Sequence, residues 1–344
     1  MKGYHYVGLD VHKKVIVYCV KTADGEIINE GSISATRKDL NLFAQSLPRP
    51  WAGAMEATLF TGWIYDFLLP HADELKVGHS YMLRAICASK KKNDRIDARK
   101  LADALRCDWF PECHMAPAQV RELRQALRYR NLLVRETVKM KNKTAGLLME
   151  AGAEYNKEKL HGKKYFKELL ERLDYVPGSV KEILELSHSS MEFFDSNQKR
   201  LVRRLRENPS LSERVERLMS IPGVGEITAL TWALEIADPQ RFASVKKAVS
   251  YCGLCSGQNE SAGKTHRGPL SKQRNKHLQT ILVEAAKIAP LWNAQLAAVS
   301  QKAKDRGANR NEATIAVARK LVAYLMYVDK SGERFEMKNY LNCA

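Results

Sequence analysis

The sequence predicts an α/β domain at the start of the chain, followed by a part that is entirely α-helical. Two observations lead to this prediction. In the first third, runs rich in β-branched and aromatic residues alternate with segments of helical apolar spacing. Beyond residue 117, apolar residues recur every three or four positions almost to the end. The 344 residues are enough for more than one domain.

The first domain is expected to span residues 1–117 and to begin with a three-stranded meander. The predicted strands lie at 4–11, 14–20, 25–34, a run ending at 55–56, and 75–79. The predicted helices lie at 39–46, 61–69 and about 94–106. This mixture indicates a sheet that is mostly covered by helices.

The middle region, residues 118–208, is expected to be helical. A basic helix at 120–148 carries one apolar stripe, and a second stripe with an unbroken four-three rhythm runs over 180–205. Two such helices can form an antiparallel hairpin or an oligomerising coiled coil. They can equally be two helices of an ordinary bundle, and the spacing does not separate these alternatives.

The last domain, residues 209–344, is expected to be all-helical. Gly223 and Gly225 precede an apolar helix at 227–236, as in a helix-hairpin-helix element whose backbone N–H groups hold nucleic-acid phosphates. The alternative is a tight turn between two helices. A long polar loop is predicted at 253–268. Further helices are predicted at 244–251, 272–289, 291–306 and 311–328.

The positive charge of the chain predicts a polyanionic partner. There are 56 Lys and Arg against 39 Asp and Glu, which gives a formal net charge of +17. Nucleic acid is the leading candidate, and an anionic membrane is the alternative. No apolar run approaches the roughly 18 residues of a membrane span, and the first residues lack the apolar core of a signal peptide. We therefore expect a cytoplasmic, nucleoid-associated protein without a membrane partner.

The seven cysteines are odd in number and scattered, which does not fit a disulfide framework. Cys252 and Cys255 have C-x-x-C spacing, and Cys107, Cys113 and His114 are the residues that could complete a zinc site with them. A structural zinc site normally shows a second closely spaced ligand pair. Buried free thiols are therefore the preferred interpretation.

Asp94 and Asp97 form an acidic pair inside a basic run. If the segment is helical, their i, i+3 spacing places both carboxylates on one face, where they could share a metal ion. Basic neighbours such as Lys92 and Arg95 would attract a polyanion to the same place. The alternative is a helix N-terminus at which Asp94 caps the helix and Asp97 complements its dipole.

Two further acids stand at the ends of predicted strands. Asp10 ends the first strand and Glu56 ends a later one. Acids at the ends of two strands and on a helix can converge to bind two divalent ions about 4 Å apart, the arrangement for in-line phosphoryl displacement. The sequence contains no nucleotide-binding loop of the G-x-x-x-x-G-K-[ST] type.

The acids stand in motifs that resemble a known family. The motifs are Gly8-Leu9-Asp10-Val11-His12-Lys13, Met55-Glu56-Ala57-Thr58 and Lys92-Asn93-Asp94-Arg95-Ile96-Asp97-Ala98-Arg99. They resemble the DEDD transposases of the insertion-sequence-110 family, relatives of the Piv DNA invertases. The last domain resembles the same family through Ile221-Pro222-Gly223-Val224-Gly225, Tyr251-Cys252-Gly253-Leu254 and Ser261. The resemblance covers nearly the whole chain in the same order.

The resemblance implies a RuvC-like, RNase H-fold first domain, a coiled-coil middle and a C-terminal transposase domain with a nucleophilic serine. By motif, Asp10, Glu56, Asp94 and Asp97 would hold Mg²⁺ or Mn²⁺, and Ser261 would attack the scissile phosphate to give a covalent phosphoserine intermediate. The insertion-sequence branch of the family pairs donor and target DNA with a structured guide RNA. We also expect a homo-oligomer, a dimer or a tetramer, because recombination cuts and rejoins several strands.

The chain departs from the family pattern at three positions. Ser256 stands where Pro is usual, Ala262 replaces the Gly that usually follows the serine, and Leu59 replaces a Gly after the Glu56 motif. Ser261 keeps the family's distance from its flanking motifs, so it is preferred over Ser256 as the nucleophile. The alternative is a loop serine that only donates a hydrogen bond to phosphate.

Basic residues that follow the serine are predicted to contact nucleic-acid phosphates. They are Lys264, His266, Arg267, Lys272, Arg274 and Lys276. Two alternative functions stay open: a Piv-like DNA invertase or RuvC-like nuclease that needs no guide RNA, and a non-catalytic nucleic-acid-binding descendant of such an enzyme.

Overall fold

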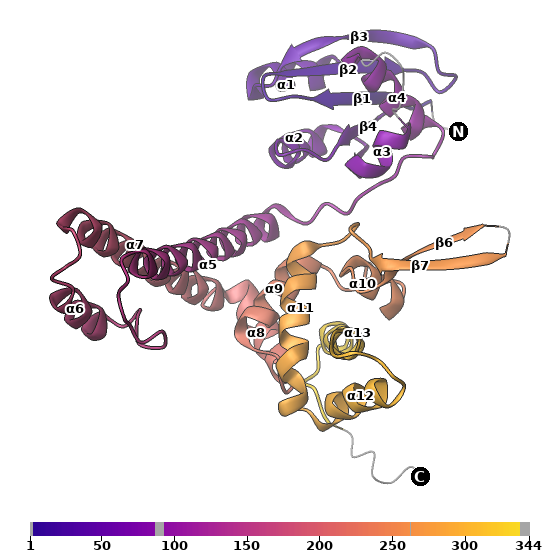
Figure 1. The fold of residues 1–344 in the computed structure, drawn as a ribbon. Coiled ribbons are helices and arrows are strands. Elements are labelled where there is room, and N and C mark those ends of the chain that lie inside the picture. The colour runs from indigo at the N-terminus through magenta and orange to yellow at the C-terminus, as the bar shows by residue number, and fades with distance from the viewer. Residues whose placement is uncertain (1–2, 87–92, 262, 338–344) are drawn as a thin grey trace. The chain divides into compact units, whose positions relative to one another are not determined.

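The computed structural model describes residues 3–86, 93–261 and 263–337. The chain divides into two compact units, Met1–Ala118 and Gln119–Ala344 (Figure 1). The first unit contains a five-stranded sheet, and the second is mostly helical. The predicted mixed α/β class is confirmed. Among the helices in the described residues, none has the length and apolar character needed to cross a membrane.

The sheet of the first unit has the strand order β3-β2-β1-β4-β5. Its strands are β1 (His5–Val11), β2 (Val15–Lys21), β3 (Ile27–Ser34), β4 (Trp51–Glu56) and β5 (Glu74–Gly78). The first three pair antiparallel, which confirms the predicted meander. β4 pairs in parallel with β1, with Met55 beside Leu9, and β5 pairs in parallel with β4. Because parallel strands end at the same edge, Asp10 and Glu56 are brought to neighbouring positions there.

Helices cover both faces of this sheet. They are α1 (Arg37–Ser46), α2 (Thr61–Leu68) with the short 3₁₀ helix η1 (Leu69–His71), α3 (Ser80–Ile86) and α4 (Asp94–Arg106). α1 and α2 pack on the face that carries Leu9, whereas Ala98 of α4 packs with Val17 on the opposite face. Since side chains alternate along a strand, Gly8 and Asp10 face α4.

The contact between α4 and β1 depends on Gly8. A Cβ atom at this position would lie 2.0 Å from the carbonyl oxygen of Ala98 and 2.6 Å from the amide nitrogen of Ala102. Both contacts are with backbone atoms, which a side-chain rotation cannot relieve. Only glycine therefore lets α4 approach the strand closely enough to place its first turn over Asp10.

We expect Gly8→Ala to lower the free energy of unfolding by about 1–3 kcal/mol, because the added methyl group forces α4 away from the sheet. Urea unfolding followed by circular dichroism measures the change. Gly3→Ala is the matched control, since a Cβ atom at Gly3 would meet nothing within 4 Å. Equal stability of the two variants would contradict the close packing of α4 on β1.

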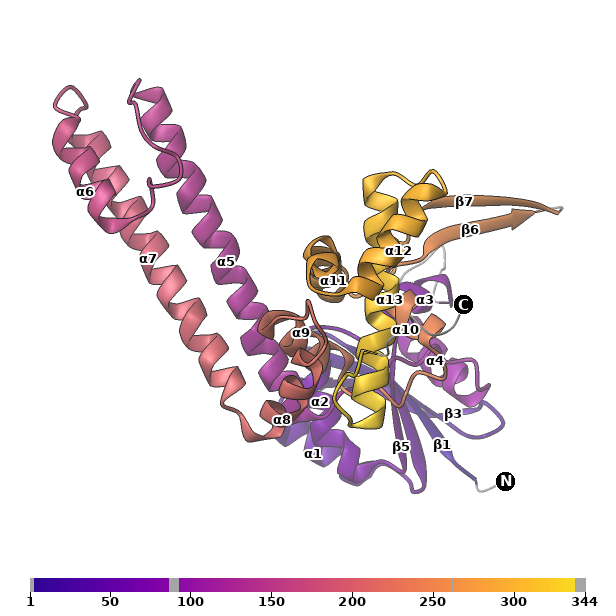
Figure 2. The same ribbon diagram turned by 90° about the horizontal axis from the view of Figure 1, so that it is seen from below.

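Two long helices begin the second unit. α5 (Ala118–Glu150) and α7 (Gly178–Arg206) run in opposite directions, with α6 (Lys163–Arg172) between them in the chain (Figure 2). Leu148, Phe166 and Leu184 share one apolar cluster, and Arg130 of α5 donates a hydrogen bond of 3.0 Å to Gln198 of α7 farther along. The two predicted helices are confirmed, whereas their packing as a coiled coil stays a prediction.

The remaining helices form one core. They are α8 (Pro209–Met219), α9 (Glu226–Ile236), α10 (Val245–Tyr251), α11 (Lys276–Ile288), the 3₁₀ helix η2 (Ala289–Leu291), α12 (Ala294–Asp305) and α13 (Arg310–Ser331). α9 lies at the centre, since every residue from 228 to 236 is buried. Leu127 of α5 and Leu205 of α7 belong to the same core. The long helices are thus anchored to the C-terminal part of the chain.

The segment predicted as a loop at 253–268 contains a β-hairpin. β6 (Ser256–Ser261) pairs antiparallel with β7 (Lys264–Leu270), and Ser261 lies opposite Lys264. The expectation of an all-helical last domain was therefore wrong at this point. The hairpin escaped prediction because both strands are polar, so neither shows the apolar alternation that marks a half-buried strand. Gly263, in the connection, has a φ of 76° that suits a tight turn.

Candidate active site

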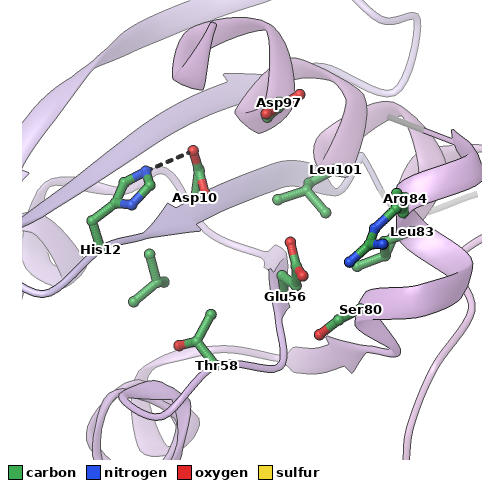
Figure 3. A pocket seen from close by; sticks show the side chains of 10 residues that line it. Asp10, His12, Glu56, Thr58, Ser80, Leu83, Arg84, Asp97 and Leu101 are labelled. Atoms are coloured by element: carbon green, nitrogen blue, oxygen red, sulfur yellow. Dashed lines mark hydrogen bonds and ion pairs between the residues drawn. The ribbon is translucent and has the colours of Figure 1, made fainter. Parts of the chain in front are cut away.

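Three of the four predicted acids surround one cavity. Asp10 on β1, Glu56 at the end of β4 and Asp97 on α4 line a cavity of about 520 Å³ in the first unit (Figure 3). The parallel pairing of β1 with β4 accounts for the first two, and the approach of α4 at Gly8 accounts for the third. Residues far apart in the sequence therefore meet at one edge of the sheet.

Asp94 joins this group through His12. The Nε2 atom of His12 lies 3.1 Å from Oδ2 of Asp10 and 3.5 Å from Oδ2 of Asp94. One ligand atom from each of Asp10, His12 and Asp94 lies within 4.8 Å of the others. These three side chains have a spacing that a single metal ion can bridge.

His12 was not among the predicted site residues. The sequence could have indicated it, because His12 follows Asp10 by two residues, and residues i and i+2 of a strand point to the same face. β1 ends at Val11, directly before His12. The side chain of His12 is about half exposed, whereas that of Asp10 is only 16% exposed. The histidine thus lies at the mouth of the site.

The first turn of α4 places its two acids differently. Asn93 caps the helix by accepting a hydrogen bond from the backbone N–H of Arg95 (2.9 Å), so the alternative in which Asp94 is the cap was wrong. Asp94 is the first helical residue and is half exposed, and Asp97 follows one turn later toward the cavity. Both acids lie where the positive end of the helix dipole favours negative charge.

The electrostatics of Asp10 favour a bound cation. Burial raises the pKa of the Asp10 carboxyl, His12 opposes this through its charge and hydrogen bond, and the nearby charges of Asp94 and Asp97 raise the pKa further. A divalent cation would compensate both the burial and the repulsion. Carboxylate oxygens are the ligands that Mg²⁺ and Mn²⁺ prefer, so the residues present fit such an ion.

The backbone that presents Glu56 is held by two threonines. Thr61 donates a hydrogen bond to the carbonyl oxygen of Glu56 (2.8 Å) and accepts one from the backbone N–H of Thr58 (2.7 Å). Leu59, which replaces a glycine of the family pattern, is 96% exposed and has a conformation open to any residue. Leu59 therefore needs no backbone conformation that only glycine adopts.

The cavity also contains a cationic side chain that the sequence did not single out. Arg84 and Ser80 of α3 line it on the side of Glu56 (Figure 3). Ser80 donates a hydrogen bond of 2.7 Å to the carbonyl oxygen of Ala57, which ties the start of α3 to the end of β4. α3 was not predicted, so its contribution to the cavity was missed.

The basic residues around the acidic pair have different surroundings. Arg95 is exposed, whereas Arg99 forms a two-pronged ion pair with Glu30 of β3, with both N–O distances 2.7 Å. Arg99 is therefore engaged within the sheet. Lys92 lies outside the described residues.

The second unit carries the predicted serine and its basic neighbours. Ser261 is exposed at the end of β6, next to the hairpin turn, whereas Ser256 lies at the opposite end of the strand, paired with Leu270. Lys264 and His266 lie on β7 and are exposed. Ala262 and the side chain of Arg267 lie outside the described residues.

The other predicted contact residues lie beyond the hairpin and beside α9. Lys272 and Arg274 are exposed, and Lys276 is the first residue of α11. Gly223 has a φ of 93° and packs against Ala289 in the turn between α8 and α9. Gly225 caps α9. Phosphate binding by this turn stays a prediction.

Among the described residues, Cys252 and Cys255 do not belong to a cluster of potential metal ligands. Cys252 is buried, and its burial raises the pKa of the thiol to about 12. Cys255 is half-buried. Cys252 is thus buried, as the preferred interpretation expects, whereas Cys107 is exposed.

Comparison with known proteins identifies the family of the chain. Residues 7–152 match the DEDD transposase model of the IS110 type, described as a transposase. Residues 215–301 match the model described as transposase IS116/IS110/IS902 family. The chain belongs to the IS110/IS116/IS902 family of transposases. The predicted resemblance to this family is thereby confirmed.

This transposase is similar to several curated proteins. It is 25% identical over 295 residues to the transposase for insertion sequence element IS1328 of Yersinia enterocolitica, a match that covers 84% of each chain. It is 25% identical over 287 residues to the putative transposase y4pF/y4sB of Sinorhizobium fredii, covering 81% of this chain and 71% of the relative. It is 26% identical over 201 residues to the transposase for insertion sequence element IS1111A of Coxiella burnetii, a match that covers 57% of this chain and 54% of the relative.

Proposed function

We propose that this transposase cuts and rejoins DNA with a divalent cation held by Asp10, Glu56, Asp94 and Asp97, and with the hydroxyl of Ser261 as the nucleophile. The observation that carries the proposal is the cavity lined by Asp10, Glu56 and Asp97, to which His12 joins Asp94. We assign the first unit a RuvC-like RNase H fold on the basis of its sheet order and its covering helices.

The residues of the site have distinct roles in this proposal. Asp10 would lie deeper in the site than Asp94, because its side chain is 16% exposed whereas that of Asp94 is 54% exposed. Glu56 and Asp97 complete the oxygen ligands, and His12 orients Asp10 by hydrogen bonding. When bound, Mg²⁺ or Mn²⁺ would neutralise the charge that develops on the phosphate. Arg84 of α3, on the side of Glu56, would bind a phosphate oxygen.

Ser261 supplies the attacking hydroxyl. Its oxygen would lose its proton and form a bond with the scissile phosphorus, while the bond to one DNA oxygen breaks and that oxygen takes up a proton. The resulting phosphoserine ester would keep the energy of the phosphodiester bond for rejoining, so no nucleotide would be consumed. The position of Ser261 beside the turn of an exposed hairpin supports this role, because such a side chain is accessible to a DNA strand.

The nucleic-acid partners are donor and target DNA, together with a structured guide RNA. The formal net charge of +17 supports a polyanionic partner. Lys264, His266, Lys272 and Arg274 on and after the hairpin, and the glycine turn before α9, would contact phosphates. We further propose a homo-oligomer, a dimer or a tetramer, that acts at the nucleoid in the cytoplasm.

Replacing Ser261 by Ala tests the proposed nucleophile. Purified transposase is incubated with labelled DNA that carries the junctions flanking its own gene, with Mg²⁺ and the RNA that copurifies. We expect a covalent protein–DNA adduct on denaturing gels with the wild type and with Ser256→Ala, and none with Ser261→Ala, because alanine has no hydroxyl to form the ester. An adduct that persists in Ser261→Ala refutes this assignment.

The RNA that copurifies distinguishes the guided recombinase from the alternatives. A discrete structured RNA, identified by sequencing, supports guidance. Adduct formation by an RNA-free preparation would instead support a Piv-like invertase or a RuvC-like nuclease. DNA binding without either cleavage or adduct would indicate a non-catalytic protein.

A further inference from the structure

Two neighbouring cavities in the second unit form one groove across the start of α9. A cavity of about 450 Å³ lies between α5, α7 and the first residues of α9. A second cavity of about 400 Å³ lies between α5, α9 and α11. Arg130 and Ile227 line both, so the cavities adjoin at these two residues.

The lining of this basic groove is rich in cationic side chains from three helices. They are Arg130 and Arg135 on α5, Lys199, Arg203 and Arg206 on α7, and Lys276 on α11. His277 of α11 also lines the groove, but burial lowers its pKa and favours the neutral imidazole. Three acids, Glu207, Glu226 and Glu284, also line it. The positive charges outnumber the negative ones.

Some of these charges are already engaged. Arg206 lies 3.2 Å from Glu216 and 3.7 Å from Glu226, Lys199 lies 2.7 Å from Asp195, and the acid Glu284 lies 2.7 Å from Lys287 outside the groove. No ion pair within the described part of the chain involves Arg130, Arg135, Arg203 or Lys276. Four cations of the groove are therefore available to an anionic ligand.

Arg130 occupies the junction of the two cavities without a carboxylate partner. Its guanidinium donates hydrogen bonds to the neutral oxygens of Gln198 (3.0 Å) and Asn131 (3.1 Å). Burial alone lowers the pKa of Arg130, with no neighbouring negative charge to oppose the shift. A half-buried cation with only neutral partners lacks the counter-charge that normally offsets its desolvation, and a bound phosphate would supply it.

The start of α9 adds to the positive field. Ile227 of its first turn lines both cavities, and Gly225 caps the helix with no side chain to cover that end. A Cβ atom at Gly225 would meet nothing within 4 Å. The backbone N–H groups of a helix N-terminus attract anions, so this end complements the cations of α5, α7 and α11.

We propose that the basic groove binds the sugar–phosphate backbone of a single nucleic-acid strand. The length of the groove, which extends over two cavities, suits several consecutive phosphates rather than one small anion. Among its described lining residues there is no Phe, Tyr or Trp on which a base could stack, so recognition goes to the backbone and not to the base sequence. The groove is lined by residues of the second unit, and the proposal does not depend on the chemistry proposed for the carboxylate cavity.

Removing exposed cations of the groove tests the proposal. The full-length protein carries Arg135→Gln with Arg203→Gln, and the control carries Lys143→Gln with Arg204→Gln. Each pair removes one exposed cation from α5 and one from α7, and neither control residue lines the groove. Fluorescence anisotropy measures binding of a labelled 20-nucleotide single strand of DNA, the same strand of RNA, and the DNA duplex. EDTA is present, so that cleavage does not contribute.

We expect the groove variant to bind single strands about tenfold more weakly, with the slope of log affinity against log salt reduced by about 1.4, because each lost contact releases about 0.7 fewer counterions. The control should keep the affinity and slope of the wild type. Arg130→Gln should weaken binding as well, and circular dichroism checks that every variant is folded. Equal loss for DNA and RNA supports contacts with phosphates alone, and a larger loss for RNA supports added contacts with the 2′-hydroxyl.

Other outcomes would overturn the proposal. Unchanged binding by the groove variant, or equal loss in the groove and control variants, would show that the groove holds no strand. A loss confined to the duplex would exclude a single strand as the occupant. Because the assay measures binding without catalysis, each of these results is distinct from a failure of the proposed recombinase chemistry.

Discussion

Replacing Asp10 by Asn should reduce DNA cleavage and adduct formation at least about 10³-fold, while DNA binding is retained. The amide removes the negative charge of the least exposed carboxylate that faces His12. A metal ion contributes several kcal/mol to stabilising a phosphoryl-transfer transition state, and about 1.4 kcal/mol corresponds to a factor of ten in rate. The measurement is the rate of strand cleavage on DNA carrying the transposase's own junctions.

Asp24→Asn provides the control for this experiment. Asp24 lies exposed in the turn between β2 and β3, so its replacement removes one carboxylate of the same unit without touching the cavity. It should cleave at the rate of the wild type. Cleavage by Asp10→Asn at more than a tenth of the wild-type rate, with Mg²⁺ present, would rule out Asp10 as a ligand of the catalytic ion.

The first unit could be predicted from its sequence because its strands and helices are strongly patterned. β1, β2 and β4 are apolar runs, and Asp10 and Glu56 stand out as acids in the last two residues of β1 and β4. The parallel pairing of β4 with β1 could not be predicted from the apolar pattern. Parallel pairing requires a crossover connection between the two strands, and the pattern within each strand does not show where that connection leads. The convergence of Asp10 and Glu56 was therefore inferred from the motifs, not from the spacing.

The features that were missed have weak or local signals. α3 has seven residues, of which only Leu83 is buried, so it shows no apolar stripe, yet it supplies Arg84 to the cavity. Asn93 takes the N-cap in place of Asp94 because either side chain can accept the hydrogen bond, and the sequence does not fix the first residue of the helix. Among the side chains of β6 and β7 that the structure describes, none is fully buried, so the hairpin shows no apolar face that could have revealed it.

The basic groove shows a further limit of sequence reasoning. In the sequence, Arg130 is one of many basic residues on the long helix predicted at 120–148, any of which could contact RNA or DNA. In the folded chain, Arg130 donates a hydrogen bond to Gln198 of α7 and lines a cavity together with Ile227 of α9. Net charge predicts that a protein binds a polyanion, but the cations that lack a carboxylate partner are found only once the helices are packed.

Replacing Glu235 by Gln should lower the free energy of unfolding of the second unit by about 2–4 kcal/mol. Glu235 on α9 is fully buried and accepts hydrogen bonds from Arg128 (2.8 Å) and Asn275 (2.8 Å), with Arg124 3.7 Å away. Removing one member of a buried ion pair leaves the others desolvated and unpaired, which costs about 3–5 kcal/mol. The expected value is somewhat smaller because Arg128 is about half exposed and can rehydrate.

The pKa values in this cluster give the prediction a pH signature. Burial tends to raise the pKa of Glu235, but the hydrogen bonds from Arg128 and Asn275 outweigh it and hold the pKa below the usual glutamate value. Hydrogen bonding to Glu235 raises the pKa of Arg128, whereas burial lowers that of Arg124, so Arg128 is the main partner. A lowered carboxyl pKa stabilises the fold above the unfolded-state pKa of about 4.3 and loses that effect as the pH falls through the folded-state value.

Urea unfolding at neutral pH and at several acidic pH values separates this contribution from others. The stability difference between the wild type and Glu235→Gln should be constant above about pH 5 and should shrink as the pH is lowered, because Glu235 then becomes protonated and neutral like glutamine. Glu216→Gln is the matched control, since Glu216 pairs with Arg206 at an exposed site and should change stability by less than about 1 kcal/mol. A difference that stays the same at every pH would show that Glu235 acts through packing and not through its charge.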